Sequence, residues 1–159
     1  MAKHRKKSAG GLPAKGRLRD MADSLWSLAV RADWGDRCAV CGTTLNLNAH
    51  HLIRRGCYPV RYLLENGICL CATHHKWCGE VSPHSNGHGF AVWIEEHYPA
   101  RHQWFKDTRA SGAHKALLTV NVEFYLDAIR SLRQYVEPEE FERIVGVKLA
   151  RHLDEDEPK

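Results

Sequence analysis

Two short pairs of potential metal ligands restrict the fold of this chain more than any other feature. Cys38-x2-Cys41 and Cys71-x2-His74 are separated by about thirty residues, and two such pairs commonly enclose one tetrahedral zinc ion. The ion would cross-link two segments of a chain whose 159 residues suffice for one domain. We therefore predict a structural zinc site formed by Cys38, Cys41, Cys71 and His74. The alternative is a set of ordinary buried cysteines beside a surface histidine.

The fourth zinc ligand has an alternative in the sequence. Cys78 lies close to Cys71 and is an alternative to His74. Cys57 has no partner at metal spacing and is interpreted as a lone thiol.

The charge of the chain is unevenly distributed. Residues 1–20 carry seven basic side chains against one acidic side chain, whereas the stretch from Glu137 onward carries eight acidic against four basic ones. A basic arm suits a polyanion such as DNA, because neutralised phosphates release counterions. The competing interpretation is a solubilising tail.

The hydropathy of the chain favours a location inside the cell, where cysteines are kept reduced. Apolar runs are too short for a membrane span, and the N-terminus lacks the apolar centre of a signal peptide. We therefore expect a cytoplasmic protein with no membrane partner, and assume a monomer. In such a compartment the six cysteines are more often metal ligands than disulfides.

Apolar periodicity predicts an α+β protein. A helix is expected from Leu18 to near Gly35, a β-hairpin over residues 37–50, a second ordered stretch over 68–71, and a helix from about Ala72. Later apolar stripes predict helices over 90–109, broken at Pro99, over 122–136 and from Pro138 onward. The predicted parts are a basic arm (1–16), a domain (17–110) with a ββα core (37–80), a C-terminal helical hairpin (111–153) and an acidic tail (154–159).

A second group of residues has the composition of a catalytic site. His50 and His51 are adjacent, Asn66 follows fifteen residues later, and His75 neighbours the zinc ligand His74. Side chains alternate along a strand, so one histidine can bind a metal while the other acts as a base. Phosphodiester cleavage requires an activated water, a group that orients the base, and a cation beside the phosphate.

The run of these residues, with Leu-Cys-x2-His-His after the asparagine, resembles the HNH endonuclease family over about residues 37–78. The resemblance implies a ββα-metal fold, His51 as general base and Asn66 as the residue that orients it. It also implies a catalytic ion held by His75 and by His50, where the family has an acidic residue. His74 stands where the family has its fourth cysteine, and an exchange of roles between His74 and His75 stays open.

The histidine at position 50, where the family has an acidic residue, changes which catalytic metal is expected. Replacing an oxygen donor with nitrogen shifts the preference from Mg²⁺ toward Mn²⁺, Ni²⁺ or Zn²⁺. The layout is also similar to phage-encoded recombination nucleases of the NinG/Rap kind, which would place the protein in a host cytoplasm. Arg54, Arg55 and Arg61 stand where such a protein would contact nucleic acid, although adjacent arginines are also common in solvated turns.

The sequence thus predicts a metal-dependent DNA endonuclease. The alternatives are a zinc-knuckle module that binds nucleic acid without cutting it and a zinc-stabilised protein interaction domain. The remaining histidines are expected at surface positions without a metal role: His84, His88, His97, His102 and His114. The tryptophans Trp77, Trp93 and Trp104 are expected to pack in the core.

Overall fold

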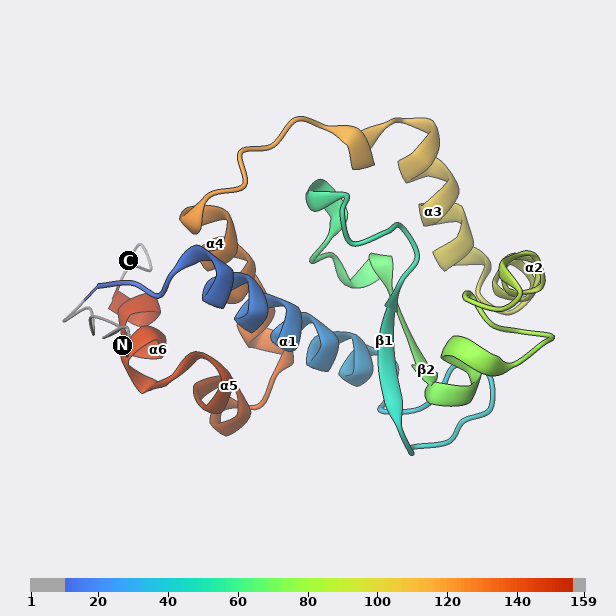
Figure 1. The fold of residues 1–159 in the computed structure, drawn as a ribbon, viewed down its shortest axis with the longest axis horizontal. Helices are drawn as coiled ribbons and strands as arrows, with labels where there is room; N and C mark the ends of the chain where they lie inside the picture. The colour runs from blue at the N-terminus through green and yellow to red at the C-terminus, as the bar shows by residue number, and fades with distance from the viewer. Residues whose placement is uncertain (1–10, 156–159) are drawn as a thin grey trace, which may run out of the picture.

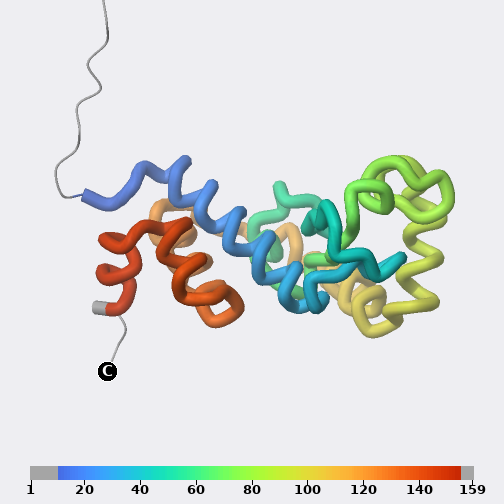
Figure 2. Tube along the Cα trace, turned by 90° about the horizontal axis from the view of Figure 1, so that it is seen from below, coloured from blue at the N-terminus to red at the C-terminus, as the bar shows by residue number. Residues whose placement is uncertain are grey.

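The structure, a computed structural model, describes residues 11–155. Residues 1–10 of the predicted basic arm and 156–159 of the predicted acidic tail lie outside the described residues. The predicted α+β class is confirmed, because helices surround one two-stranded sheet. Helix α1 (Lys15–Asp33) runs from a helical half at one end of the molecule to the sheet, as Figures 1 and 2 both show.

The helical half is built on the apolar face of α1. Residues three and four apart along this helix are buried, and they meet α4 (Val122–Leu132), α5 (Pro138–Val145) and α6 (Val147–Glu155) in one core. Asn121 caps α4 by accepting from the Phe124 backbone N–H, and Pro138 begins α5 as predicted. The main buried contributors are Leu18, Leu25, Ala29, Tyr125, Ile129, Leu132, Phe141 and Leu153.

The C-terminal region holds three helices where a two-helix hairpin was expected. The predicted helix from Pro138 ends at Val145, because Gly146 takes a positive φ of 83° that a continuous helix excludes. The chain then restarts as α6. No helix among the described residues is long and apolar enough to cross a membrane.

The sheet pairs β1 (Leu47–His51) with β2 (Gly67–Cys71) in antiparallel register, with His50 opposite Ile68. The hairpin expected over residues 37–50 is therefore wrong, since β1 pairs with β2 and the cysteine turn stays outside the sheet. Gly67 permits the close approach of α1, because a Cβ there would lie 2.3 Å from a methyl carbon of Val30. The sheet is thereby seated directly on α1.

The other end of the molecule is formed by α2 (Gly87–His97) and α3 (Pro99–Ala110). A second, smaller core joins β2 to α2 through Ile68, Leu70, Phe90 and Ile94. Between β2 and α2 the chain makes one π-helical turn, Thr73–Trp77, where a longer helix was expected. Two of the three histidines of the predicted metal sites, His74 and His75, lie on this turn.

Candidate metal centres

Cys38 and Cys41 lie on a tight turn directly after α1. The Cys38 backbone N–H donates to the Thr43 carbonyl at 2.9 Å, and the Gly42 N–H donates to the Cys38 carbonyl at 2.8 Å. Gly42 closes the turn at a φ of 72°, a conformation that favours glycine. These bonds fold the turn so that both cysteines belong to one side-chain cluster.

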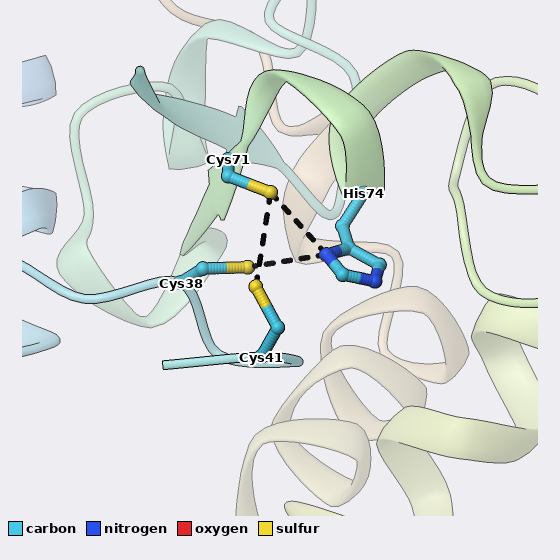
Figure 3. A group of neighbouring side chains, drawn as sticks. All are labelled: Cys38, Cys41, Cys71 and His74. Carbon is cyan, nitrogen blue, oxygen red and sulfur yellow. Dashed lines mark hydrogen bonds between the residues drawn. The ribbon is translucent and has the colours of Figure 1, made fainter. Parts of the chain in front are cut away.

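The cluster is completed by Cys71 at the end of β2 and by His74 on the π turn (Figure 3). His74 Nδ1 lies 3.3 Å from Cys71 Sγ and 3.6 Å from Cys38 Sγ, and the sulfurs of Cys41 and Cys71 are 3.9 Å apart. All four donor atoms lie within 4.8 Å of one another. Cys78, the alternative fourth ligand, is not part of this group. The four side chains form a group that could hold a metal ion.

The spacing of these donors fits a tetrahedral ion. Zinc bonds of about 2.3 Å to sulfur and about 2.0 Å to nitrogen require edges of about 3.8 Å between sulfurs and about 3.5 Å between sulfur and nitrogen. The observed distances of 3.9, 3.6 and 3.3 Å lie close to these edges. The sulfur-rich donor set is the one that zinc prefers over magnesium or calcium.

The thiols of Cys38 and Cys69 differ in how readily they ionise. Burial opposes ionisation of Cys38, but hydrogen bonds from the backbone at Cys71, Cys41 and Val40 outweigh it and lower its pKa. Burial raises the pKa of Cys69 to about 11. A thiolate is the form that binds metal, so the surroundings favour Cys38 as a ligand and keep Cys69 a neutral thiol.

A second cluster consists of His50, His75 and His84. His50 Nδ1 lies 3.2 Å from His75 Nε2, and the His84 ring centroid lies 5.1 Å and 4.8 Å from those of His50 and His75. Two nitrogens bound to one ion at about 2.0–2.1 Å are separated by about 3.3 Å in tetrahedral and about 2.9 Å in octahedral geometry. The observed 3.2 Å falls between these values.

Two imidazoles of this cluster, those of His50 and His75, are held neutral. Burial, followed by the neighbouring histidines, lowers the pKa of His50 to about 3, and burial also lowers the pKa of His75. A neutral imidazole keeps the lone pair that a metal requires. The buried Nδ1 of His75 has no hydrogen-bond partner among the described residues. These observations fit a group of ligands for a metal ion.

His84 is the site residue that sequence reasoning missed. It is exposed, as predicted, but it lies in the metal-ligand group rather than apart from any metal. The buried Ser82 hydroxyl donates to the His75 carbonyl at 3.1 Å and accepts from the His84 backbone N–H at 3.3 Å. These bonds fold the loop back over the π turn. No spacing rule could have found this contact, because it depends on the path of an irregular loop.

His51 points away from the histidine cluster, as alternation along β1 predicts. Its Nε2 lies 3.0 Å from the Arg61 carbonyl oxygen. A carbonyl can only accept, so Nε2 carries the proton and the lone pair is on Nδ1. Burial, opposed by the bond to the Arg61 carbonyl, lowers the pKa of His51 to about 4. The half-buried ring is therefore a neutral imidazole of defined tautomer, the state a general base needs.

The resemblance implied that Asn66 orients His51, but the Asn66 side chain bonds to backbone groups and not to His51. The side chain is fully buried and its amide bonds to backbone, accepting from the Ile53 N–H at 2.6 Å and donating to the Ile53 and Val60 carbonyls at 3.0 and 2.9 Å. It thus fixes both ends of the loop between β1 and β2. The group that bonds His51 is instead the Arg61 carbonyl, which lies within the same loop.

The three arginines predicted to contact nucleic acid differ in their exposure. Arg54 and Arg55 are exposed. Arg61, in contrast, is only 5% exposed and donates to the Asp23 carboxylate and the Arg55 carbonyl, so the prediction that it contacts nucleic acid is wrong. The predicted core packing of Trp77 is also wrong, because this side chain, the last of the π turn, is 69% exposed.

Comparison of the chain with protein-family models, with curated proteins and with solved structures finds no match in any of the three.

Proposed function

We propose that the protein is a metal-dependent endonuclease of the HNH, or ββα-metal, type that hydrolyses phosphodiester bonds in DNA. The observation that carries the proposal is a neutral imidazole of fixed tautomer, His51, next in sequence to a member of a three-imidazole cluster. Strand β1 supplies His50 and His51, the turn after β2 supplies His75, and Asn66 directly precedes β2. A protein that only binds nucleic acid has no need for this arrangement.

The opposite directions of His50 and His51 suit an in-line displacement. The attacking water and the leaving oxygen lie on opposite sides of the phosphorus atom, so a base and a cation must flank the phosphate rather than share one side. The proposal requires a phosphate bound at the end of β1 to reach both His51 and the histidine cluster. A divalent ion held by His50, His75 and His84 would supply Lewis-acid stabilisation of charge on the leaving oxygen.

The proton path follows from the tautomer. His51 Nδ1 takes a proton from water, and the hydroxide oxygen bonds to phosphorus while the bond from phosphorus to the 3′ oxygen breaks. The 3′ oxygen takes a proton from solvent, which gives a 5′ phosphate and a 3′ hydroxyl. His51 then returns its proton to solvent. The Arg61 carbonyl keeps Nε2 protonated throughout, so that only Nδ1 exchanges a proton.

We assign the Cys38, Cys41, Cys71 and His74 cluster to a structural zinc. Four protein donors fill a tetrahedral ion and leave no position for substrate. The nitrogen-only donor set of the other cluster favours Mn²⁺, Ni²⁺ or Zn²⁺ over Mg²⁺.

The test is cleavage of supercoiled plasmid by purified protein in EDTA, with each divalent ion added back and with His51→Ala and His88→Ala beside the wild type. We expect metal-dependent cutting that falls by about 10²- to 10⁴-fold in His51→Ala, the usual contribution of a general base. His88 is exposed and outside both clusters, so His88→Ala should cut like the wild type. Equal cutting by His51→Ala and wild type would contradict the proposal.

A second function, a zinc-knuckle module that binds DNA without cutting it, is favoured by one observation. The Cys3His cluster and the exposed Arg54 and Arg55 would suffice for binding. Salt-sensitive DNA binding by a wild type that cuts with none of the ions would support this function over the nuclease.

A further inference from the structure

Helix α1, outside the predicted 37–80 core, contacts the ring of His51. The indole of Trp26 is stacked on the imidazole, with ring centroids 3.7 Å apart and planes inclined by 14°. Trp26 is 3% exposed, and its Nε1–H donates to the Leu63 carbonyl at 3.0 Å. The indole is thus fixed by the core on one side and by the loop before β2 on the other.

A second connection from α1 reaches His51 through Arg61. The carbonyl of Arg61 bonds His51 Nε2, while its guanidinium donates to Asp23 at 2.6 Å through Nη2 and at 3.0 Å through Nε. Its Nη1 donates to the Arg55 carbonyl at 2.7 Å. Arg61 is nearly fully buried, and a two-point contact with a carboxylate fixes a guanidinium in direction as well as position. Asp23 therefore sets where the Arg61 backbone lies.

Asp23 and Trp26 are three residues apart and share one face of the helix. One turn of α1 thus controls the plane of the His51 ring through Trp26 and its in-plane hydrogen bond through Arg61. A reacting group displaced by about 1 Å loses on the order of 100-fold in rate. The indole face also attracts the imidazolium that forms when His51 takes a proton.

We propose that Asp23 and Trp26 are positioning residues for the base, which makes α1 part of the active site. This inference rests on the proposed function, because it assigns His51 the role of base. Trp26 holds the ring plane by stacking, and Asp23 holds the proton on Nε2 by fixing the Arg61 carbonyl.

Trp26→Leu and Asp23→Asn should lower kcat for plasmid cleavage by about 10- to 100-fold, because both misplace the base. The KM for DNA should stay within about twofold, because neither side chain belongs to the binding surface. Trp26→Phe retains an aromatic face and should restore most of the kcat that Trp26→Leu loses. Ser24→Ala is the matched control, since Ser24 is exposed on the same turn. Unchanged kcat in Trp26→Leu and Asp23→Asn would overturn the proposal.

The His51→Ala background separates positioning from general damage to the fold. If both residues act through His51, adding either substitution to His51→Ala should lower the residual cleavage no further. A further loss as large as that in the wild-type background would contradict the proposal.

A measurement on the wild type covers the case in which a variant fails to fold. Nuclear magnetic resonance of the zinc-loaded protein should show the His51 ring protons shifted upfield by the indole, with nitrogen shifts of an Nε2–H tautomer. Unshifted protons or an Nδ1–H tautomer would overturn the positioning role. If these signals are present while the wild type cuts no DNA with any ion, the proposed function fails and the arrangement of α1 around His51 stands.

Discussion

The two metal-ligand clusters share one turn of the chain and differ in almost every other respect. His74 and His75 are neighbours on the π turn Thr73–Trp77, yet each belongs to a different cluster. The first offers four donors, of which Cys38 and Cys71 are buried and Cys41 is exposed. The second offers three imidazoles, and its His84 is exposed. One cluster is chemically closed, and the other leaves positions open.

Under the proposed function, this difference assigns a structural role to the first cluster and a catalytic role to the second. A zinc ion with four protein ligands cannot bind substrate, whereas three nitrogen ligands leave room for water or phosphate. Because the two clusters share the π turn, the open cluster is expected to depend on the closed one, and not the reverse. Loss of the closed site should release the turn and with it His75, whereas loss of the open site should leave the fold intact.

The largest effect is expected when the closed cluster is broken. Cys71→Ser should remove about one zinc per chain and lower the melting temperature by roughly 10 °C or more, because structural zinc supplies folding free energy directly. Cleavage should disappear as well, since the turn that carries His75 loses its anchor. Zinc content and thermal unfolding measure this, with Cys57→Ser as the control outside both clusters. A Cys71→Ser protein with unchanged zinc and melting temperature would remove the distinction between the clusters.

An intermediate effect is expected when the open cluster loses its exposed member. His84→Ala should raise the concentration of metal needed for half-maximal cleavage by about tenfold or more, since even loss of outer-shell partners has effects of 10- to 100-fold. The melting temperature and the structural zinc should not change. His88→Ala, four residues later at the start of α2, is the matched control because His88 is exposed and outside both clusters. If metal activation is identical in both variants, His84 is not a ligand.

The smallest effect concerns the exposed arginines of the loop after β1. Arg54→Ala and Arg55→Ala should each weaken DNA binding and reduce the salt slope of the affinity by about one, as expected for loss of one phosphate contact. Lys148→Ala is the control, since Lys148 is exposed on α6 at the other end of the molecule. Titration of DNA at several salt concentrations measures the slope. A slope that changes equally in all three variants would show no preference for this surface.

The sequence predicted the parts of the fold and site that depend on local pattern. Apolar spacing located α1 and the later helices, and alternation along a strand separated His50 from His51. Short ligand spacing identified Cys38, Cys41, Cys71 and His74, which the structure brings together.

Contacts between distant segments could not be predicted in the same way. Arg61 resembles a phosphate-binding residue until Asp23, 38 residues earlier, is found to pair with it in the interior. His84 joins the open cluster only because Ser82 folds an irregular loop onto the π turn. Asn66 bonds the backbone of a loop whose path no periodicity describes. Each of these depends on tertiary packing rather than on local pattern.

Stepwise removal of metal tests the division between the two clusters most directly. The metal content of the fully loaded protein, its circular dichroism and its plasmid cleavage would be followed together at increasing chelator concentration. We predict that cleavage is lost first, with one zinc per chain and unchanged helical signal remaining, and that the fold is lost only when the last zinc leaves. Full cleavage by the one-zinc protein, or loss of both ions and the fold in a single step, would contradict this account.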